Sequence, residues 1–217
     1  MKLKSNFWKH ILRNIWIFLF IYFFITLKYP AFGILALGCM LAPVFFAVFY
    51  GRKWCGWFCP RGNFNDRILA KISLKRKYPE FIKTNWFRIL FLVVLMSAFS
   101  IQIFFADSLN MVGFVFLRMV LITTIIAIIF GIVYKERAWC MFCPMGSLAT
   151  WVAAIPKFAS KIKNVEFQKQ ECVSCNLCEN ACPMDIKITE NDKFVNNPNC
   201  IKCEECVSKC KKSALKY

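Results

Sequence analysis

The sequence contains little acid and a single histidine. Of its 217 residues only 12 are Asp or Glu, against 29 Lys or Arg, and the one histidine is His10. A haem held between two histidines of this chain is therefore excluded. The sequence also shows no grouping of acidic, basic and nucleophilic side chains of the kind that bond-making enzymes use. We therefore do not expect a self-contained enzyme.

Polar segments long enough to build a large soluble domain are also scarce. Hydrophobic residues make up 59% of the chain, and the mean hydropathy is +0.49. A soluble domain is usually closer to half apolar and lacks apolar runs of membrane-spanning length. Four such runs occur here, at residues 15–27, 31–50, 86–105 and 111–134. The sequence therefore predicts an all-α four-helix transmembrane bundle made of two repeated hairpins, followed by a small polar domain.

The first apolar run is the shortest of the four. It approaches the roughly 20 residues of a spanning helix only when residues 11–14 are added. Its length would also suit the apolar core of a signal peptide. No small-residue cleavage site follows it, however, and the next apolar run begins almost at once. We therefore expect a retained membrane anchor.

Basic residues flank the apolar runs on one side only. Four precede the first run without any acid, and nine lie within residues 51–85 against two acids. The turns on the other side carry only Lys28 and Asp107. Because basic loops stay in the cytoplasm, we expect both termini and everything after Tyr134 to be cytoplasmic, in the membrane of a bacterium or archaeon. The net charge of +17 is thus a topology signal, and nucleic acid is not an expected partner.

Cysteine is abundant, with 13 residues, although the expected compartment keeps thiols reduced. Eight of them lie in the C-terminal part, as "CVSCNLCENACP" and "CIKCEECVSKC". The spacing C-x2-C-x2-C-x3-C is typical of bacterial two-cluster ferredoxins, in which the fourth cysteine of each motif ligates the other cluster. Structural zinc uses separated cysteine pairs instead. We therefore predict a small α+β ferredoxin-like domain with two [4Fe–4S] clusters, one held by Cys172, Cys175, Cys178 and Cys210 and the other by Cys200, Cys203, Cys206 and Cys182.

These patterns divide the chain into three parts. We expect a four-span membrane domain at residues 1–160, a basic linker at 161–167 and the ferredoxin-like domain at 168–217. The linker is predicted from Pro156 and the basic stretch "KFASKIKN" that follows it.

Four further cysteines form two Cys-Pro motifs in the membrane part, "YGRKWCGWFCPRG" and "YKERAWCMFCPMG". The two stretches are 84 residues apart, and each follows a pair of apolar runs. Their cysteine spacing differs, with three residues between Cys55 and Cys59 but two between Cys140 and Cys143. The sequence thus predicts a tandem repeat that places one cysteine pair at the cytoplasmic end of each hairpin.

The four motif cysteines admit three interpretations. They hold a third [4Fe–4S] cluster at the membrane interface, they are redox thiols that form disulfides or bind copper transiently, or they are small residues at a packing seam. Free cysteines are often buried but rarely occur as paired Cys-Pro motifs at matching repeat positions. We expect the third cluster, with the charges of Arg52, Lys53 and Arg137 favouring its reduction.

Other residues carry weaker signals. We expect a helix to restart after each Cys-Pro motif, capped by Asn63 or Asn65 in the first and by Ser147 in the second. Cys39 has no partner in the sequence and is interpreted as a packing residue. Arg118 lies inside the fourth apolar run, where a charge is costly. We interpret it either as a residue that binds a quinol or an anionic cofactor or as one whose side chain reaches the membrane surface.

Together these motifs resemble those of the membrane polyferredoxin family, which includes NapH-, NosR- and CcoG-type proteins. The resemblance covers nearly the whole chain and rests on the twelve grouped cysteines. The family pattern C-x3-C-P matches at Cys55, Cys59 and Pro60, whereas Cys140 and Cys143 are one residue closer together. The chain shows no flavin-attachment motif, which disfavours a whole-protein role of the NosR type.

The resemblance implies an integral membrane iron–sulfur protein that serves as the electron-transfer subunit of a membrane oxidoreductase. Such a protein relays single electrons between its cytoplasmic ferredoxin-like domain and a membrane redox partner, and the family favours a quinol-linked one. A cytoplasmic ferredoxin is the other redox partner that we consider. The alternatives are an assembly protein that reduces a metal ion such as copper and a redox-sensing membrane accessory protein.

Overall fold

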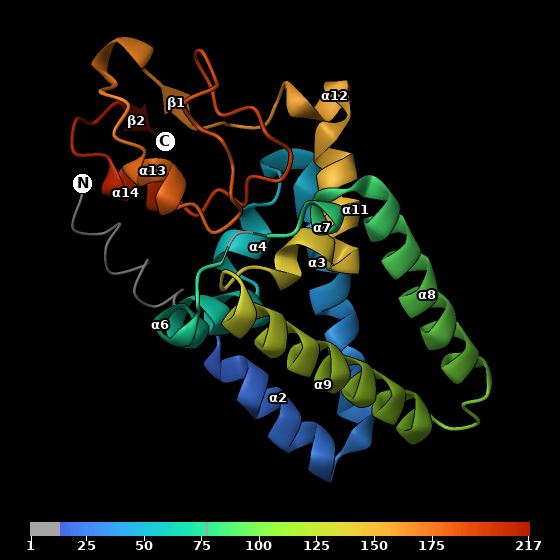
Figure 1. Cartoon of the computed structure of the whole chain (residues 1–217). Helices are drawn as coiled ribbons and strands as arrows, with labels where there is room; N and C mark the ends of the chain where they lie inside the picture. The colour runs from blue at the N-terminus through green and yellow to red at the C-terminus, as the bar shows by residue number, and fades with distance from the viewer. Residues whose placement is uncertain (1–13, 77) are drawn as a thin grey trace.

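The apolar runs form helices whose polar ends gather around the cysteine motifs (Figure 1). The computed structural model describes residues 14–76 and 78–217. His10, the four basic residues before the first run and the residues 11–13 that were expected to lengthen that run lie outside the described part.

The two predicted hairpins are present, with helices of unequal length. The first consists of α2 (Ile17–Lys28), the 3-10 helix η1 (Pro30–Ile34) and α3 (Leu35–Tyr50). The second consists of α8 (Asn85–Phe104) and α9 (Leu109–Val133). Three helices, η1 with α3, α8 and α9, are long and apolar enough to cross a membrane, whereas α2 has 12 residues. Within residues 14–76 and 78–217 the protein is therefore mostly helical, with three candidate membrane helices.

The hairpins cross closely at the end that lies away from the cysteine motifs. A Cβ atom added to Gly33 of η1 would lie 2.2 Å from the carbonyl oxygen of Gly113 of α9. A Cβ added to Gly113 would lie 1.7 Å from the carbonyl oxygen of Pro30. Small residues of this kind let helix backbones approach within a membrane, where packing drives association. The two glycines thus join the first hairpin to the second.

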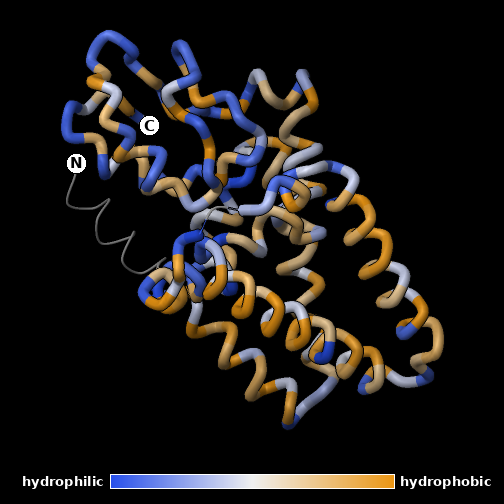
Figure 2. Tube along the Cα trace, in the orientation of Figure 1, coloured by the Kyte–Doolittle hydropathy of each residue, from blue (hydrophilic) through white to orange (hydrophobic). Residues whose placement is uncertain are grey.

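Helix α8 stands apart from the other long helices (Figure 1). Arg88 is its only buried residue, and only 6% of its apolar window is buried. Figure 2 shows hydrophobic residues along the length of α2, α8 and α9 and hydrophilic ones in the C-terminal part. The sides of these helices are therefore suited to contact lipid.

Short helices flank each Cys-Pro step, and the helix that directly follows the step begins at its proline. Those of the first repeat are α4 (Lys53–Trp57), α5 (Pro60–Phe64), the π-helical segment η2 (Asn65–Leu69) and α6 (Ala70–Ile72). After α7 (Glu80–Lys83), the second repeat provides α10 (Trp139–Phe142), α11 (Pro144–Ala154) and α12 (Pro156–Ala159).

The expected caps are therefore wrong, because the helices start before Asn63, Asn65 and Ser147. Proline is well suited to the first helical position, since its φ is fixed and its missing N–H would be unpaired there. Asn63 lies inside α5 and donates its side-chain N–H to the carbonyl oxygens of Trp57 and Cys59, at 2.8 and 3.1 Å.

The two repeats exchange packing partners. Helix α11 of the second repeat packs along α3 of the first repeat. In the first repeat, α5 packs against α2, and η2 packs against α9 of the second repeat. This interlocking brings both Cys-Pro motifs to the same place, at the polar ends of the long helices (Figure 1).

The C-terminal part, which we call the head (residues 166–217), is a pair of similar halves. Strand β1 (Glu166–Phe167) pairs antiparallel with β2 (Leu215–Lys216), with Phe167 opposite Leu215. Strand β1 lies in the segment expected as a linker. Between the strands lie η3 (Lys169–Glu171), α13 (Leu177–Asn180) and α14 (Glu205–Lys209), and the two α-helices pack against each other.

Candidate metal centres

Each cysteine loop of the head holds two residues in the left-handed region of backbone space. These are Ser174 (φ 50°) and Asn176 (φ 56°) in the first loop and Lys202 (φ 54°) and Glu204 (φ 62°) in the second. None is glycine, so each conformation costs on the order of 1 kcal/mol or more. Alternating left- and right-handed residues turn successive N–H groups to the same side and form a concave anion-binding loop. Both loops therefore share a strained conformation that suits an anionic group.

The structure brings the eight head cysteines together in the two predicted quartets. Each quartet lines a cavity of its own, within the head. One cavity is lined by Cys172, Cys175, Cys178 and Cys210, and the other by Cys182, Cys200, Cys203 and Cys206. In each quartet three cysteines come from one loop and the fourth from the other half of the head.

The four Cys-Pro cysteines also share one cavity, although they come from two repeats. Cys55 lies on α4 and Cys140 on α10, while Cys59 and Cys143 directly precede α5 and α11. All four line a cavity of about 140 Å³ that extends between α2, α3 and α9. We call them the interface quartet.

Burial raises the pKa of three thiols of the interface quartet. It raises the pKa of Cys55 to about 12, although the charge of Arg52 opposes the shift. It also raises the pKa of Cys59 and of Cys143. Reactive free thiols usually have a lowered pKa and an exposed sulfur. The environment of this quartet therefore differs from that of a typical reactive thiol.

Polar groups without a partner in the described part of the chain line the same cavity. Both side-chain amide atoms of Asn65 are unpaired although the residue is 1% exposed, and the Nε atoms of Arg52 and Arg61 are unpaired as well. Asn65 begins the π-helical segment η2, a distortion that is frequent at functional sites. Hydrogen-bond donors around the sulfurs are a feature of iron–sulfur sites. The residues present thus fit a cluster.

The second loop of the head packs directly on the first Cys-Pro motif. A Cβ atom added to Gly56 would lie 2.2 Å from the carbonyl oxygen of Ile201, and Trp57 Nε1 donates to the carbonyl oxygen of Lys202 at 2.8 Å. Further along the seam, the hydroxyl of Tyr78 donates to the carbonyl oxygen of Pro183 at 2.7 Å. The quartet of the second loop therefore lies next to the interface quartet.

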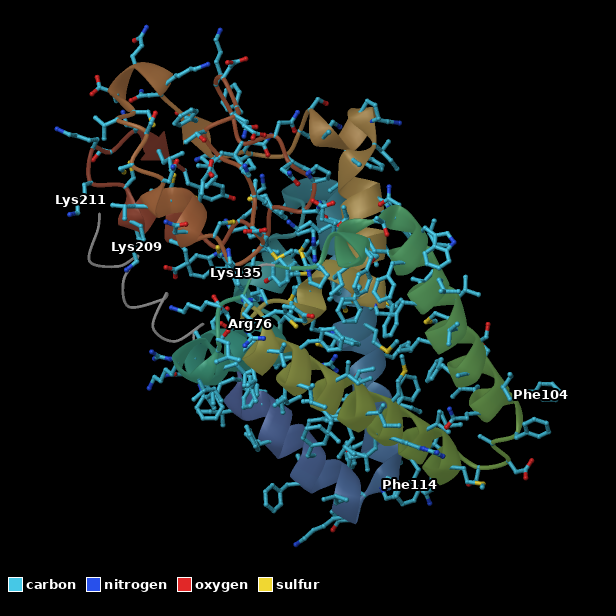
Figure 3. The ribbon with its side chains drawn as sticks, in the orientation of Figure 1. Arg76, Phe104, Phe114, Lys135, Lys209 and Lys211 are labelled. Atoms are coloured by element: carbon cyan, nitrogen blue, oxygen red, sulfur yellow. The ribbon has the colours of Figure 1, made fainter. Side chains whose placement is uncertain are left out.

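The quartet of the first loop lies on the far side of the head from the membrane helices. Its cavity is lined by head residues alone, and Cys175 is exposed. Figure 3 shows Lys209 and Lys211 on the outer side of the head and Lys135 at the seam with the helices. The three quartets are thus arranged in a row that leads from the membrane helices to the outside of the head.

Arg118 and Cys39, which the sequence also singled out, lie on the long helices α9 and α3. Arg118 is exposed on α9 and does not line the cavity of the interface quartet. Cys39, interpreted as a packing residue, lies exposed on α3 and lines that cavity together with Met40 and Met145. Sequence reasoning also missed Asn65 as a cavity residue, because it read as an ordinary helix cap.

No three His, Cys, Asp or Glu side chains are arranged to hold a single metal ion within residues 14–76 and 78–217. The four thiolates of a [4Fe–4S] site each bind a different iron, so they do not converge on one point.

Family models match both parts of the chain. A model described as a 4Fe-4S binding domain matches twice, at residues 32–79 and 116–163. The two matches start at the same offset as that between Tyr50 and Tyr134, in agreement with the tandem repeat. A 4Fe-4S dicluster domain matches residues 171–215. The chain is accordingly an iron–sulfur protein with [4Fe–4S]-binding domains in its membrane part and in its head.

Curated relatives narrow the family. An uncharacterized protein of Methanocaldococcus jannaschii is 31% identical over 77% of this chain and 72% of its own length. The ferredoxin-type protein NapH of Haemophilus influenzae is 24% identical over 83% of this chain and 67% of its own length. Protein RdxA of Cereibacter sphaeroides is 25% identical over 74% of this chain and 40% of its own length. No solved structure matches the chain.

The chain belongs to the membrane polyferredoxin family. It is an iron–sulfur electron-transfer protein related to NapH and RdxA, and its apolar helices make it a membrane protein. The chain spans less than half of the length of RdxA, so that protein is a relative of this one only over part of its sequence.

Proposed function

We propose that the protein relays single electrons between its head, on the cytoplasmic face, and a redox partner in the membrane. Three [4Fe–4S] clusters, one for each quartet, would supply the one-electron chemistry when bound. The observation that carries the proposal is the row of three cysteine quartets, each around its own cavity. The second head loop packs on α4, and this contact fixes the distance between the head quartets and the interface quartet.

The proposed membrane domain has four spans in two hairpins. Two features support the cytoplasmic orientation of both termini and of the head. Lys135 and Lys209 lie at the head end of the structure in Figure 3. The opposite ends of α8 and α9 carry Phe104 and Phe114. Because basic segments stay in the cytoplasm, the head is proposed to face it.

The surroundings of the interface quartet exclude water and set its electrostatics. Trp54 stacks on Phe58 with ring centroids 5.4 Å apart, and Trp139 and Phe142 pack edge to face at 5.1 Å. The guanidinium of Arg61 lies 5.5 Å from the ring centre of Trp139. Burial disfavours the extra negative charge that reduction adds, whereas nearby arginines favour it. The protein therefore supplies position and reduction potential rather than an acid or a base.

The two ends of the row suit different partners. The cavity of the interface quartet has an apolar side formed by Leu19, Ala36, Pro43 and Val120, between the membrane helices. A quinol or the apolar segment of a membrane redox protein is the proposed partner there. A cytoplasmic ferredoxin is the proposed partner at the exposed first loop, where Val173 is 61% exposed beside Cys172.

Iron content and EPR spectroscopy test the proposal. Anaerobically purified full-length protein is expected to hold about twelve irons per chain and to give three reducible centres, because each cubane holds four irons. About eight irons and two centres would show that the interface quartet holds no cluster. A colourless, iron-free protein would refute the whole proposal.

Reduction of a metal ion such as copper to its soft monovalent state is a second candidate function. The observation that favours it is the sulfur of Cys39, Met40 and Met145 in the same cavity as the interface quartet. Thiolate and thioether ligands select Cu(I) over hard cations. Copper-dependent oxidation of the dithionite-reduced protein, lost in Cys39→Ser with all irons retained, is the result expected of this function. If copper does not oxidise the reduced protein, electron relay remains as the proposed function.

A further inference from the structure

Two arginines occupy matching positions in the membrane repeat. Arg52 precedes Cys55 by three residues, and Arg137 precedes Cys140 by three. Arg52 Nη2 donates to the carbonyl oxygen of Cys140, and Arg137 Nη1 donates to that of Cys55, each at 2.6 Å. The arginines are 1% and 0% exposed. Each repeat therefore fixes the first cysteine of the other.

A glycine makes room for each of these guanidinium groups. A Cβ atom added to Gly62 would lie 2.3 Å from Arg137 Nη1, and one added to Gly146 would lie 2.8 Å from Arg52 Nη2. Both glycines lie two residues after the proline of their motif. The glycine of each Cys-Pro motif is thus explained by the arginine that comes from the other repeat.

The two arginines differ in whether a carboxylate neutralises their positive charge. Arg137 forms a two-pronged ion pair with Asp66, with Nε–Oδ1 and Nη2–Oδ2 distances of 2.7 and 2.6 Å. Among the residues that the structure describes, Arg52 donates only to carbonyl oxygens, those of Cys140 and, at 3.4 Å, Asn199. No ion pair of Arg52 occurs in the described part of the chain, and residues 1–13 and 77 contain no Asp or Glu. A buried charge without a counter-charge is costly unless a ligand supplies one.

We propose that Arg52 supplies the charge that balances the third cluster and raises its reduction potential, whereas Arg137 positions the quartet with its charge already neutralised by Asp66. This inference rests on the proposed third cluster. Cysteine thiolates make such a site anionic, and an added electron makes it more so. A buried positive charge acts strongly on that electron, because the effective dielectric constant is lower than in water. Arg52 is thus a charge-balancing residue that acts on the cluster without ligating it.

The test uses the full chain in detergent, prepared anaerobically and titrated with dithionite, which is oxidised as each centre gains one electron. Iron analysis gives the cluster content, and EPR gives the midpoint potential of each centre. Arg52→Gln is expected to keep about twelve irons. At a fixed potential it is expected to lower the reduced-to-oxidised ratio of the interface centre about tenfold, which for one electron is about 59 mV. Arg52→Lys keeps the charge and is expected to shift the ratio less.

Asp66→Asn provides a variant with the opposite expected sign. It removes the counter-charge of Arg137 and leaves a further uncompensated cation beside the quartet. Because the side chain of Asp66 is 39% exposed, its substitution removes little packing. The reduced fraction of the interface centre is expected to rise severalfold. Should Arg52→Gln lose its interface iron, the direction of the shift in Asp66→Asn decides the question.

Two results would overturn the role of Arg52. One is an interface midpoint potential that stays unchanged in both Arg52→Gln and Asp66→Asn with all irons present. The other is an equal shift in Arg52→Lys and Arg52→Gln, because charge would then not be the cause. Wild-type protein with about eight irons would instead refute the third cluster itself, and with it the proposed function.

Discussion

The head sites and the interface quartet are built in different ways from the same residue type. Each head site takes three cysteines from one loop of seven residues, such as Cys172 to Cys178, and a fourth from the other half of the head. The interface quartet takes two cysteines from each of two repeats, joined only by the fold. A head site therefore depends on local backbone strain, whereas the interface quartet depends on helix packing and on two buried arginines.

Substitution of single cysteines is expected to give the largest difference between the head sites and the interface quartet. Cys203→Ser is expected to remove about four irons from the head and leave the interface centre, while Cys143→Ser removes about four from the interface and leaves the head. Iron analysis with EPR of each variant measures this. Cys39→Ser serves as the control that keeps all irons. Loss of head signals in Cys143→Ser would mean that the sites do not form independently.

Substitutions that disturb helix packing are expected to affect the interface quartet and not the head sites. Gly62→Val places side-chain atoms where Arg137 Nη1 and the carbonyl oxygen of Cys55 now lie, 2.3 and 2.9 Å from a Cβ. Overpacking of this kind costs about 1–3 kcal/mol or more. We expect loss of the interface iron with the head clusters retained. The matched control is Gly38→Val in α3, which meets nothing within 4 Å. Equal loss in both variants would contradict the packing explanation.

A variant at the seam tests the connection between the two kinds of site. A side chain at position 56 would collide with the carbonyl oxygen of Ile201, which is 2.2 Å from an added Cβ. Gly56→Ala is therefore expected to hold every iron but to slow electron transfer between the interface centre and the head severalfold. Rapid-freeze EPR after mixing with a reductant measures the rate. An unchanged rate would show that this contact is not part of the path.

The smallest expected effect concerns the ion pairs that dock the head. Burial alone would raise the pKa of Asp185, but hydrogen bonds and charges from Lys83 and Lys135, at 2.8 and 3.1 Å, hold it below its usual value. A lowered pKa means that the ionised carboxylate stabilises the folded state above about pH 4 and that this contribution is lost as the pH falls through the lowered value.

The Asp185 contribution is expected to be under about 1 kcal/mol, since all three side chains are partly exposed. Thermal unfolding of wild type and Asp185→Asn across a pH series measures it. The stability difference between the two proteins should be present at pH 7 and should shrink below about pH 4. A difference that is independent of pH would point to packing instead.

The sequence was sufficient for features that are encoded locally. Cysteine spacing predicted both head quartets, because a loop of fixed length can present its sulfurs in few ways. The offset between Tyr50 and Tyr134 predicted the repeat, and apolar runs predicted the long helices. The helix starts were missed because Pro60 and Pro144 begin helices better than the asparagines and the serine that follow them.

The rest of the interface site depends on contacts between distant residues. Spacing alone did not predict that Arg52 would reach Cys140 or that Asp66 would neutralise Arg137, since these pairs are joined only by the crossing of the hairpins. Nor could the periodicity of residues 60–72 predict a π-helical segment with an unpaired Asn65 at its start. Arg118, singled out for its place within an apolar run, lies exposed on α9 and outside the cavity of the interface quartet.

The reciprocal bonds of Arg52 and Arg137 have an evolutionary consequence. A contact in which each partner gives the other the same group is isologous, and it is the contact that two identical subunits form across a twofold axis. One ancestral hairpin carrying a single arginine and one Cys-Pro motif would thus have completed the same site as a homodimer. Fusion of two such copies in one gene would leave each free to change separately, as in the cysteine spacing, which differs between the two repeats.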